Sequence, residues 1–538
     1  MRWHKRLLLA GVAGAVALAA SACAGGQVRG ADRSPQPSTG ETAAAQAAES
    51  NDATFVYAPN LDVVTDWDPA TSYSNEIIAM SNIYEGLTRY NAQTKKPEPR
   101  LATEWTSANE GKEWTFKLRQ GVKFHSGATL DAEAAKKAIE RTREANSGAA
   151  YIWGAVDTIE TPDASTLKFT LKYATPLDLV ASSGYAAYIY DTEAVDQAKD
   201  GKTDAGTGPY TIDSWQKGKE TELTLKAFEG YWGGWKPEQY KKIAFRVTPE
   251  ITTAWQLLKQ GEINFVQRLN PQLFEQASTT EGVQATRTPS FQNLLVLFNT
   301  AGGVTKDVRV RQALQLAIDY DGLVSALKGA GVKASGLVPE GLVGHTAGLE
   351  AKQDLVKAQE LLTAAGYGPD NPELKLTMTY AQGDEDQKLL VTLLSSALKG
   401  LNVTLQAKPM AWNAQWDLGK KKGQDVFVMY WYPDYADAYS WFLNVFRSAD
   451  KPEFNLSYLK NDEVDTAVDG LPQLTATDLF GAETAYTNLQ EKIIQEQAAV
   501  AVPYVQTYQR ALTADVQGYV DNPAYPNVVF FYDLKPAS

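Results

Sequence analysis

The chain has little sulfur and little imidazole: one cysteine, Cys23, and three histidines in 538 residues. A single thiol cannot form a disulfide within the chain, so the fold must rely on its hydrophobic core. A chain this long can do so, because the buried fraction of a protein rises with its size. Beyond residue 22 only His125 and His345 remain, 220 residues apart. Their scarcity argues against a histidine-dependent catalytic triad and against a histidine-rich zinc site.

Positive charge and long apolar runs are also scarce. Lys and Arg number 51 against 64 Asp and Glu, which gives a net charge of -13. We expect no nucleic-acid partner, since phosphate neutralisation requires clustered basic side chains. The apolar run 7–20 has 14 residues and later runs are strand-sized, whereas a membrane-spanning helix needs ~20.

The N-terminus reads as an export signal. Arg2, Lys5 and Arg6 precede the apolar run, which ends in small residues directly before Cys23. A basic N-terminal region, a short apolar region and small residues before the cleavage site are typical of a signal peptide. We assign this signal peptide to residues 1–22. Its removal takes away three positive charges, so the net charge moves from -13 to -16.

Cys23 is the predicted lipidation site. The small residues before it resemble a bacterial lipobox, in which the thiol is acylated and becomes the first residue of the mature chain. Such motifs usually carry Leu three residues earlier, where this chain has Ala20. The alternative is a plain secretory signal with an incidental cysteine. Segment 23–53 would be the lipidated cysteine followed by a flexible tether, because small and polar residues bury too little surface to order it.

From Thr54 onward the pattern predicts an α/β protein. Apolar and polar residues alternate over 114–118, 167–173 and 374–380, as in half-buried strands. Between such segments lie helices, one capped by Asp307 and one near 131–142. The run Val426–Trp431 is continuously apolar, as expected for a strand buried on both faces.

Ten short motifs follow one another in a recognisable order. They are Asp68–Ala70, Tyr84–Leu87, Pro99–Trp105, Trp114–Gly127, Gly206–Tyr210, Tyr231–Gly234, Gly261–Asn264, Phe298–Asn299, Asp307–Asp319 and Leu361–Tyr367. Together they resemble the family 5 solute-binding proteins of ABC importers, the oligopeptide, dipeptide and nickel receptor group, over residues 54–538.

The resemblance implies a two-lobed periplasmic-binding-protein type II-like fold with an extra inserted domain. Lobe I would comprise 54–91, 206–286 and 508–538, the inserted domain 92–205, and lobe II 287–507. Chain crossings between the lobes would form a hinge.

Several conspicuous motifs are interpreted as structural. His125 lies in a tight turn and is read as a turn or core histidine. The glycines of 206–208 suit a close chain crossover and lack the lysine of a phosphate loop. The acidic cluster Asp384-Glu385-Asp386 is read as a helix start rather than a metal site, because acidic side chains favour helix N-termini.

The segment 431–437 is the candidate binding site. It follows the predicted buried strand, and in α/β folds ligands gather at the carboxyl ends of strands. There Asp434 is flanked by Trp431 and Tyr435, and aromatic faces and carboxylates both attract ammonium groups. For Asp434 we favour ligand binding; for Asp437, also a candidate, we favour capping of the helix that contains Trp441.

The family resemblance implies roles for individual residues. Asp434 matches the aspartate that holds the α-amino group of a peptide ligand. Trp412 matches an aromatic that lines a side-chain pocket, and Tyr73 falls where an N-terminal segment runs beside the ligand backbone. Peptide receptors can carry a basic residue where this chain has Val428, so an acidic partner is not expected there.

The predicted function is that of a monomeric, lipid-anchored receptor, not an enzyme, with no cofactor and no bound metal. It would capture a short peptide in the periplasm or on the outer face of the cytoplasmic membrane and deliver it to an ABC permease. The same fold holding a sugar, a metal chelate or a signalling molecule is the first alternative. An extracellular carbohydrate hydrolase and a purely structural lipoprotein are the others.

Overall fold

The computed structural model describes residues 53–60 and 62–537. The predicted signal peptide, Cys23 and nearly all of the tether lie outside this range. Among the described residues, none of the helices has the length and apolar character needed to cross a bilayer.

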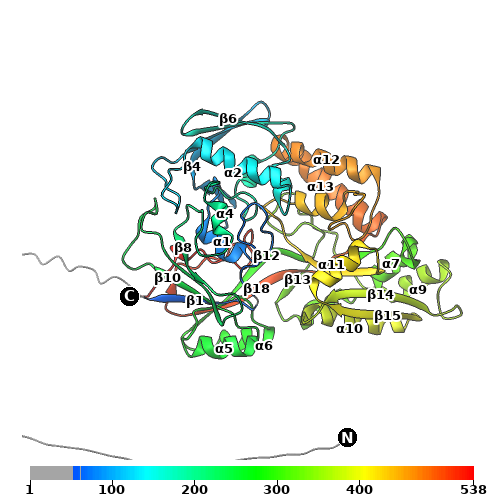
Figure 1. Ribbon diagram of the computed structural model, residues 1–538. Coiled ribbons are helices and arrows are strands. Elements are labelled where there is room, and N and C mark those ends of the chain that lie inside the picture. Colours follow the sequence, from blue (N-terminus) through cyan, green and yellow to red (C-terminus); the bar gives the residue numbers. More distant parts are fainter. Residues whose placement is uncertain (1–52, 61, 538) are drawn as a thin grey trace, which may run out of the picture. The chain divides into compact units, whose positions relative to one another are not determined.

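The largest element is a sheet with the strand order β15-β14-β16-β12-β18-β11-β1-β10-β9-β8 (Figure 1). Two short strands extend it, β13 beside β18 and β17 beside β12. Its strands are β1 (Thr54–Ala58), β8 (Tyr210–Trp215), β9 (Thr221–Ala227), β10 (Lys242–Arg246), β11 (Phe265–Val266), β12 (Val283–Phe298), β13 (Gly331–Lys333), β14 (Leu374–Ala381), β15 (Val403–Met410), β16 (Val426–Trp431), β17 (Val500–Ala501) and β18 (Tyr504–Thr513).

Strands β12 and β18 join the two predicted lobes. The first part of β12 pairs with β18 from Val283 to Pro289, and its last part pairs with β16 from Asn293 to Phe298. The register breaks between Pro289 and Asn293. Both predicted lobe crossings, at residues 286/287 and 507/508, fall within this one strand pair. A two-stranded connection with a register break is a natural hinge, and the domain edges themselves stay a prediction.

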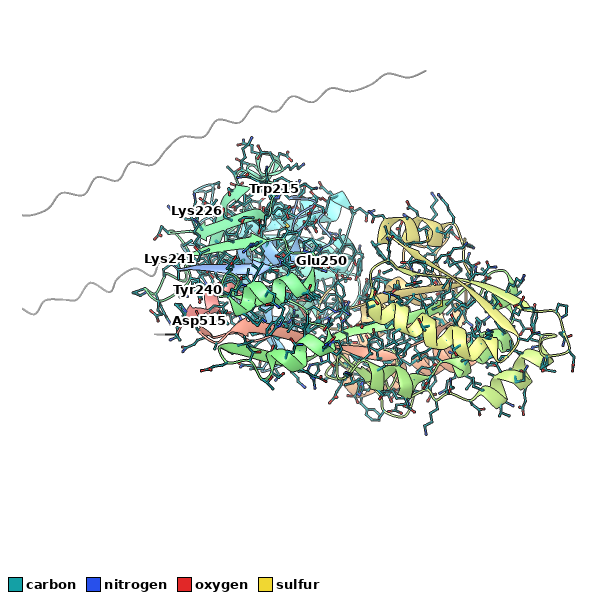
Figure 2. The ribbon with its side chains drawn as sticks, turned by 90° about the horizontal axis from the view of Figure 1, so that it is seen from below. Trp215, Lys226, Tyr240, Lys241, Glu250 and Asp515 are labelled. Carbon is teal, nitrogen blue, oxygen red and sulfur yellow. The ribbon has the colours of Figure 1, made fainter. Side chains whose placement is uncertain are left out.

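The antiparallel edge of the large sheet, β8 and β9, belongs to predicted lobe I. Figure 2 shows Trp215 and Lys226 on this edge. The ring of Trp215 packs edge-on against Trp67, with 5.7 Å between ring centroids. This contact ties the edge to the segment that follows β1.

A separate four-stranded sheet, β4-β5-β7-β6, lies entirely within predicted inserted domain 92–205. The predicted alternation is confirmed, since Trp114, Phe116 and Leu118 of β5 are buried. Two strand pairs complete the β structure, β2 with β3 and β19 with β20. The bounds are β2 (Thr88–Asn91), β3 (Lys96–Pro99), β4 (Ala102–Ala108), β5 (Glu113–Leu118), β6 (Val156–Asp163), β7 (Thr166–Leu171), β19 (Val516–Gln517) and β20 (Lys535–Pro536).

Two helices whose starts the sequence predicts begin at those residues. Asp307 caps α7 by accepting a hydrogen bond from Arg309 N, and Asp131 caps α2 through Ala134 N. The α-helices are α1 (Ile77–Ile83), α2 (Ala132–Ala145), α3 (Leu177–Val180), α4 (Val195–Ala198), α5 (Ile251–Lys259), α6 (Pro271–Ala277), α7 (Val308–Ala317), α8 (Tyr320–Ala326), α9 (Leu355–Ala364), α10 (Glu385–Lys399), α11 (Trp412–Lys420), α12 (Asp462–Thr477) and α13 (Leu479–Glu491).

The structural interpretation of His125 is confirmed. One ring nitrogen contacts the Asp204 carboxylate and the other lies 2.8 Å from the Gly208 carbonyl oxygen. The carbonyl is an acceptor and the carboxylate is an acceptor when ionised, an arrangement that favours the protonated ring. Burial opposes this charge, but the Asp204 carboxylate raises the pKa of His125 above its ordinary value.

The glycines at 206–208 do pack closely. A Cβ at Gly206 would lie 2.0 Å from the carbonyl oxygen of Ile83, and one at Gly208 would lie 2.6 Å from it. Only glycine leaves the space that this crossover needs.

Candidate functional site

Three parallel strands of predicted lobe II end at the same edge of the large sheet. Strand β14 pairs in parallel with both β15 and β16, so their carboxyl ends lie side by side. Asp384 follows β14, Trp412 follows β15, and Asp434 follows β16. Figure 1 shows β14, β15, α10 and α11 together in the yellow-green part of the ribbon. This is the edge where α/β folds place ligands.

A cavity of about 340 Å³ lies at this edge. Its walls are rich in aromatic side chains, and its charged groups are two carboxylates, with no Lys, Arg or His among the described residues that line it. The lining residues are Tyr73, Ser74, Asn75, Ala381, Asp384, Gln387, Trp412, Trp416, Val428, Met429, Tyr430, Trp431, Tyr432, Asp434 and Phe454.

Asp434 is held by groups from distant parts of the chain. Its carboxylate accepts a hydrogen bond from the Tyr73 hydroxyl at 3.1 Å and another from the Tyr151 hydroxyl. The Ser183 hydroxyl donates to its backbone carbonyl at 2.6 Å, and Asn444 donates to the Tyr151 oxygen at 2.9 Å. Segments of all three predicted domains therefore meet at this residue.

The Asp434 carboxylate is buried without a cation. Its residue is 3% exposed, and it makes no salt bridge within the part of the chain that the structure describes. Burial raises the pKa of Asp434 to about 6, although the hydroxyls of Tyr151 and Tyr73 favour the ionised form. A ligand that brings an ammonium group would supply the missing positive charge.

Parallel aromatic rings form one wall of the cavity. Trp412 and Trp416 lie one helical turn apart on α11, with ring planes 7° apart and centroids separated by 6.4 Å. Trp416 stacks in turn on Phe454 at 5.5 Å and 9°, and Trp431 meets Phe454 edge-on. Trp412 is 42% exposed, which leaves ring surface free to contact a ligand.

Four of the six candidate residues line this cavity: Asp434, Trp431, Trp412 and Tyr73. Tyr435 and Asp437 are buried but are not among its lining residues. Asp437 accepts hydrogen bonds from Tyr439 N at 2.7 Å and from the Tyr486 hydroxyl at 3.2 Å. The π-helix Trp441–Phe446 has Ser440 at its N-cap and no side-chain cap, so Asp437 holds the turn before the helix rather than capping it as expected.

Sequence reasoning missed several residues of the site. Asp384 does cap α10, as predicted, through Gln387 N, yet it also lines the cavity. The strand-end rule that found Asp434 would have found it, because it follows β14 as Asp434 follows β16. Trp416 could have been inferred from its position one turn after Trp412. Nothing in the sequence marks Tyr151, whose position near Asp434 depends on the tertiary fold.

No group of three or more His, Cys, Asp or Glu side chains within the described range is arranged to hold a metal ion. The acidic cluster at 384–386 is instead divided between a helix cap and two ion pairs.

Comparisons with known proteins agree with this arrangement. The family model described as bacterial extracellular solute-binding proteins, family 5 Middle, matches residues 96–453, well over half of the chain. This chain is a family 5 extracellular solute-binding protein. The family resemblance and the α/β two-lobed fold class are thereby confirmed, and the protein is a binding protein rather than an enzyme.

Curated relatives of this solute-binding protein cover most of its length. The probable D,D-dipeptide-binding periplasmic protein DdpA of Escherichia coli is 28% identical, over 86% of this chain and 90% of that protein. The periplasmic murein peptide-binding protein MppA of Escherichia coli is 26% identical over 85% and 88%. The glutathione-binding protein GsiB of Pectobacterium atrosepticum is 29% identical over 80% and 84%.

Solved structures support the fold. DppA of Helicobacter pylori, in complex with the peptide STSA, superposes with a TM-score of 0.78 at 22% identity and covers 90% of this chain and 98% of its own. NikA of Brucella suis, in complex with Fe(III)-EDTA, has a TM-score of 0.79 at 19% identity and covers 90% and 100%. At these identities the likeness shows the fold alone.

Proposed function

We propose that this protein is the solute receptor of an ABC importer and that it binds a short peptide with a free amino terminus. The observation that carries the proposal is Asp434, a buried carboxylate without a cation at the edge of an aromatic cavity. The α-amino group of the peptide would pair with it, and the first side chains would lie against Trp412 and Trp431. The receptor would then deliver the peptide to a membrane permease.

The energetics support an anchor of this kind. Micromolar affinity corresponds to about -8 kcal/mol. One hydrogen bond to a charged group contributes ~1.5–3 kcal/mol, so Asp434 would supply a large but partial share. The remainder would come from aromatic contacts and from hydrogen bonds to the peptide backbone. Backbone hydrogen bonds depend on the length of the peptide more than on the identity of its side chains.

Closure of the lobes would complete the site. Tyr73 comes from predicted lobe I, Tyr151 and Ser183 from the predicted inserted domain, and all three bond to Asp434 of predicted lobe II. These contacts can form only when the parts lie together. We propose that the strand pair β12–β18 acts as the hinge and that closure removes the peptide from water, which strengthens its ion pair.

The names of relatives favour a peptide over other solutes. The curated relatives described above are named for a D,D-dipeptide, a murein peptide and glutathione. The same fold also holds Fe(III)-EDTA in NikA, so a metal chelate, sugar or signalling molecule remains the alternative ligand for this fold.

The most direct test identifies the natural ligand. We expect that denaturing the freshly purified protein releases a peptide that mass spectrometry detects, because closure traps the ligand. The stripped and refolded protein should then gain thermal stability from synthetic copies of that peptide, about 2.7 kcal/mol at a hundred times Kd. Release of a sugar or chelate instead, with no stabilisation by any peptide, would contradict the proposal.

We further propose that Cys23, outside the described residues, carries a lipid that anchors the receptor to the membrane. The expected result is that Cys23→Ser moves the protein from the membrane fraction to the soluble fraction without changing ligand binding. Intact mass measurement should show a diacylglycerol-sized addition on the wild type alone. An unmodified wild-type mass would support the plain secretory signal.

A further inference from the structure

Asp434 is not the only carboxylate of the cavity without a salt bridge: within the described residues Asp384 forms none either. We propose that the peptide carries a second positive charge, a Lys or Arg side chain near its amino terminus, and that Asp384 binds it. This inference rests on the proposed peptide-receptor function and specifies its ligand: a peptide with two cationic groups, one for each carboxylate.

The charges at the start of α10 do not cancel. Asp386 forms a salt bridge with Arg268, and Glu385 forms one with Lys388 at 3.1 Å. Asp384 forms none within the described range of the chain. The three carboxylates at the start of α10 therefore form two salt bridges between them. The carboxylate without a salt bridge is that of Asp384, which lines the cavity.

Asp384 is held in place by its own helix. It accepts a hydrogen bond from Gln387 N at 2.9 Å, and the Tyr430 hydroxyl lies 3.5 Å from the same oxygen. Both neighbours also line the cavity. Burial raises the pKa of Asp384, which the nearby Arg268 opposes. The backbone N–H of Asp386 also stabilises the carboxylate, yet no salt bridge within the described residues neutralises it, so its charge remains available to a cationic ligand.

Gln387 adds a second polar group to this corner. Its side chain is buried, with the residue 2% exposed, and its Oε1 accepts from Ala381 N at 2.8 Å. No hydrogen bond within the described part of the chain uses its amide nitrogen, although Gln387 lines the cavity. A carbonyl of a bound peptide could therefore accept a hydrogen bond from it.

The aromatic wall suits a cationic side chain. Trp412 and Trp416 line the cavity together with Asp384, and the face of an indole attracts Lys and Arg. This wall already holds one cation of the protein itself, since Lys420 Nζ lies 3.8 Å from the centroid of a Trp416 ring. A ligand lysine between an indole face and a carboxylate would gain from both.

The same arrangement disfavours acidic peptides. Two unpaired carboxylates and no lining cation would repel a ligand glutamate, and Val428 offers it no hydrogen bond. We therefore expect this receptor to reject the acidic peptides that a cavity with a basic side chain would accept.

Calorimetry with Lys-Ala-Ala, Ala-Ala-Ala and Glu-Ala-Ala tests the inference on the stripped and refolded full-length protein. The wild type should bind the lysyl peptide about tenfold more tightly than the alanyl peptide, which is the gain expected from one charge-assisted contact. It should bind the glutamyl peptide most weakly of the three. Asp384→Asn should abolish the preference, so that the lysyl and alanyl peptides bind with equal affinity. Asparagine caps helices as well as aspartate does, so the fold should be kept.

Glu385→Gln is the matched control, since it removes a neighbouring carboxylate that is already paired with Lys388. It should keep the full lysine preference. Equal affinity of the wild type for lysyl and alanyl peptides, or a preference that survives Asp384→Asn, would overturn the inference while leaving peptide binding at Asp434 intact. Tighter binding of free cadaverine than of Lys-Ala-Ala would overturn it too, because the ligand would then be a diamine. Absence of binding by every peptide would instead contradict the proposed function.

Discussion

Asp434→Asn is expected to weaken peptide binding by about tenfold or more, since it removes one charge-assisted hydrogen bond from the ligand. The same change is expected to stabilise the ligand-free protein at neutral pH. The two effects have opposite signs because the carboxylate is unfavourable in the empty site and favourable only when a cation joins it.

The stability effect follows from the protonation of Asp434. Burial raises the pKa of this group from 3.8 to about 6, so the folded protein binds the proton more tightly than the unfolded chain does. The folded state is therefore favoured below the unfolded pKa, and this contribution is lost as the pH rises through about 6. The loss amounts to about 3 kcal/mol at higher pH, and asparagine, which has no charge to bury, avoids it.

Melting curves of the ligand-free protein at pH 4 and pH 7.5 measure this change in folding stability. The variant should melt about 2–4 °C above the wild type at pH 7.5, and the difference should shrink at pH 4. Asp437→Asn is the matched control: it is equally buried, three residues away, and does not line the cavity, so peptide affinity should not change. Unaltered affinity in Asp434→Asn would remove the anchor assignment.

Asp521→Asn is expected to cost about 3–5 kcal/mol, because it leaves the charge of Arg510 buried without its partner. Arg510 is 0% exposed, and its Nε donates to Asp521 at 2.6 Å. Its Nη1 donates to the Gln267 carbonyl at 2.8 Å, while Nη2 has no partner among the described residues. Arg510 lies on strand β18 and Asp521 lies beyond β19, so the ion pair joins β18 to the C-terminal segment.

A double variant separates the charge effect from lost packing. Arg510→Met combined with Asp521→Leu removes both charges and should recover most of the stability lost in Asp521→Asn. Urea unfolding followed by tryptophan fluorescence gives the midpoints of all three proteins. If the single and double variants unfold at the same midpoint, the unpaired charge is not the cause of the loss.

Much of the local structure could be predicted because it depends on neighbours in sequence. The caps Asp307 and Asp384 precede apolar periodic segments, and each accepts a hydrogen bond within its own first turn. Strand β16 was found because its six apolar residues have the length of a strand and include β-branched and aromatic side chains, which favour strands. The position of Asp434 after that strand then pointed to the cavity edge.

The rest of the site depends on which strands are neighbours. Asp384 and Asp434 line one cavity because β14 pairs with β16 in parallel, and no local pattern reveals that pairing. Asp384 was accordingly read as a helix cap alone. Tyr151 is 283 residues from Asp434, and only the tertiary fold brings its hydroxyl to the carboxylate.

By itself, the sequence determined the α/β class and the family, and it predicted the export signal and the residue most suited to hold an amino group, since each rests on short-range pattern or on motif order. Only the tertiary structure decided that Asp384 and Asp434 share one cavity, that Asp437 bonds to Tyr486 instead, and that neither Asp384 nor Asp434 forms a salt bridge within the described residues. Charge balance is a property of groups close in space, and the folded chain sets those distances.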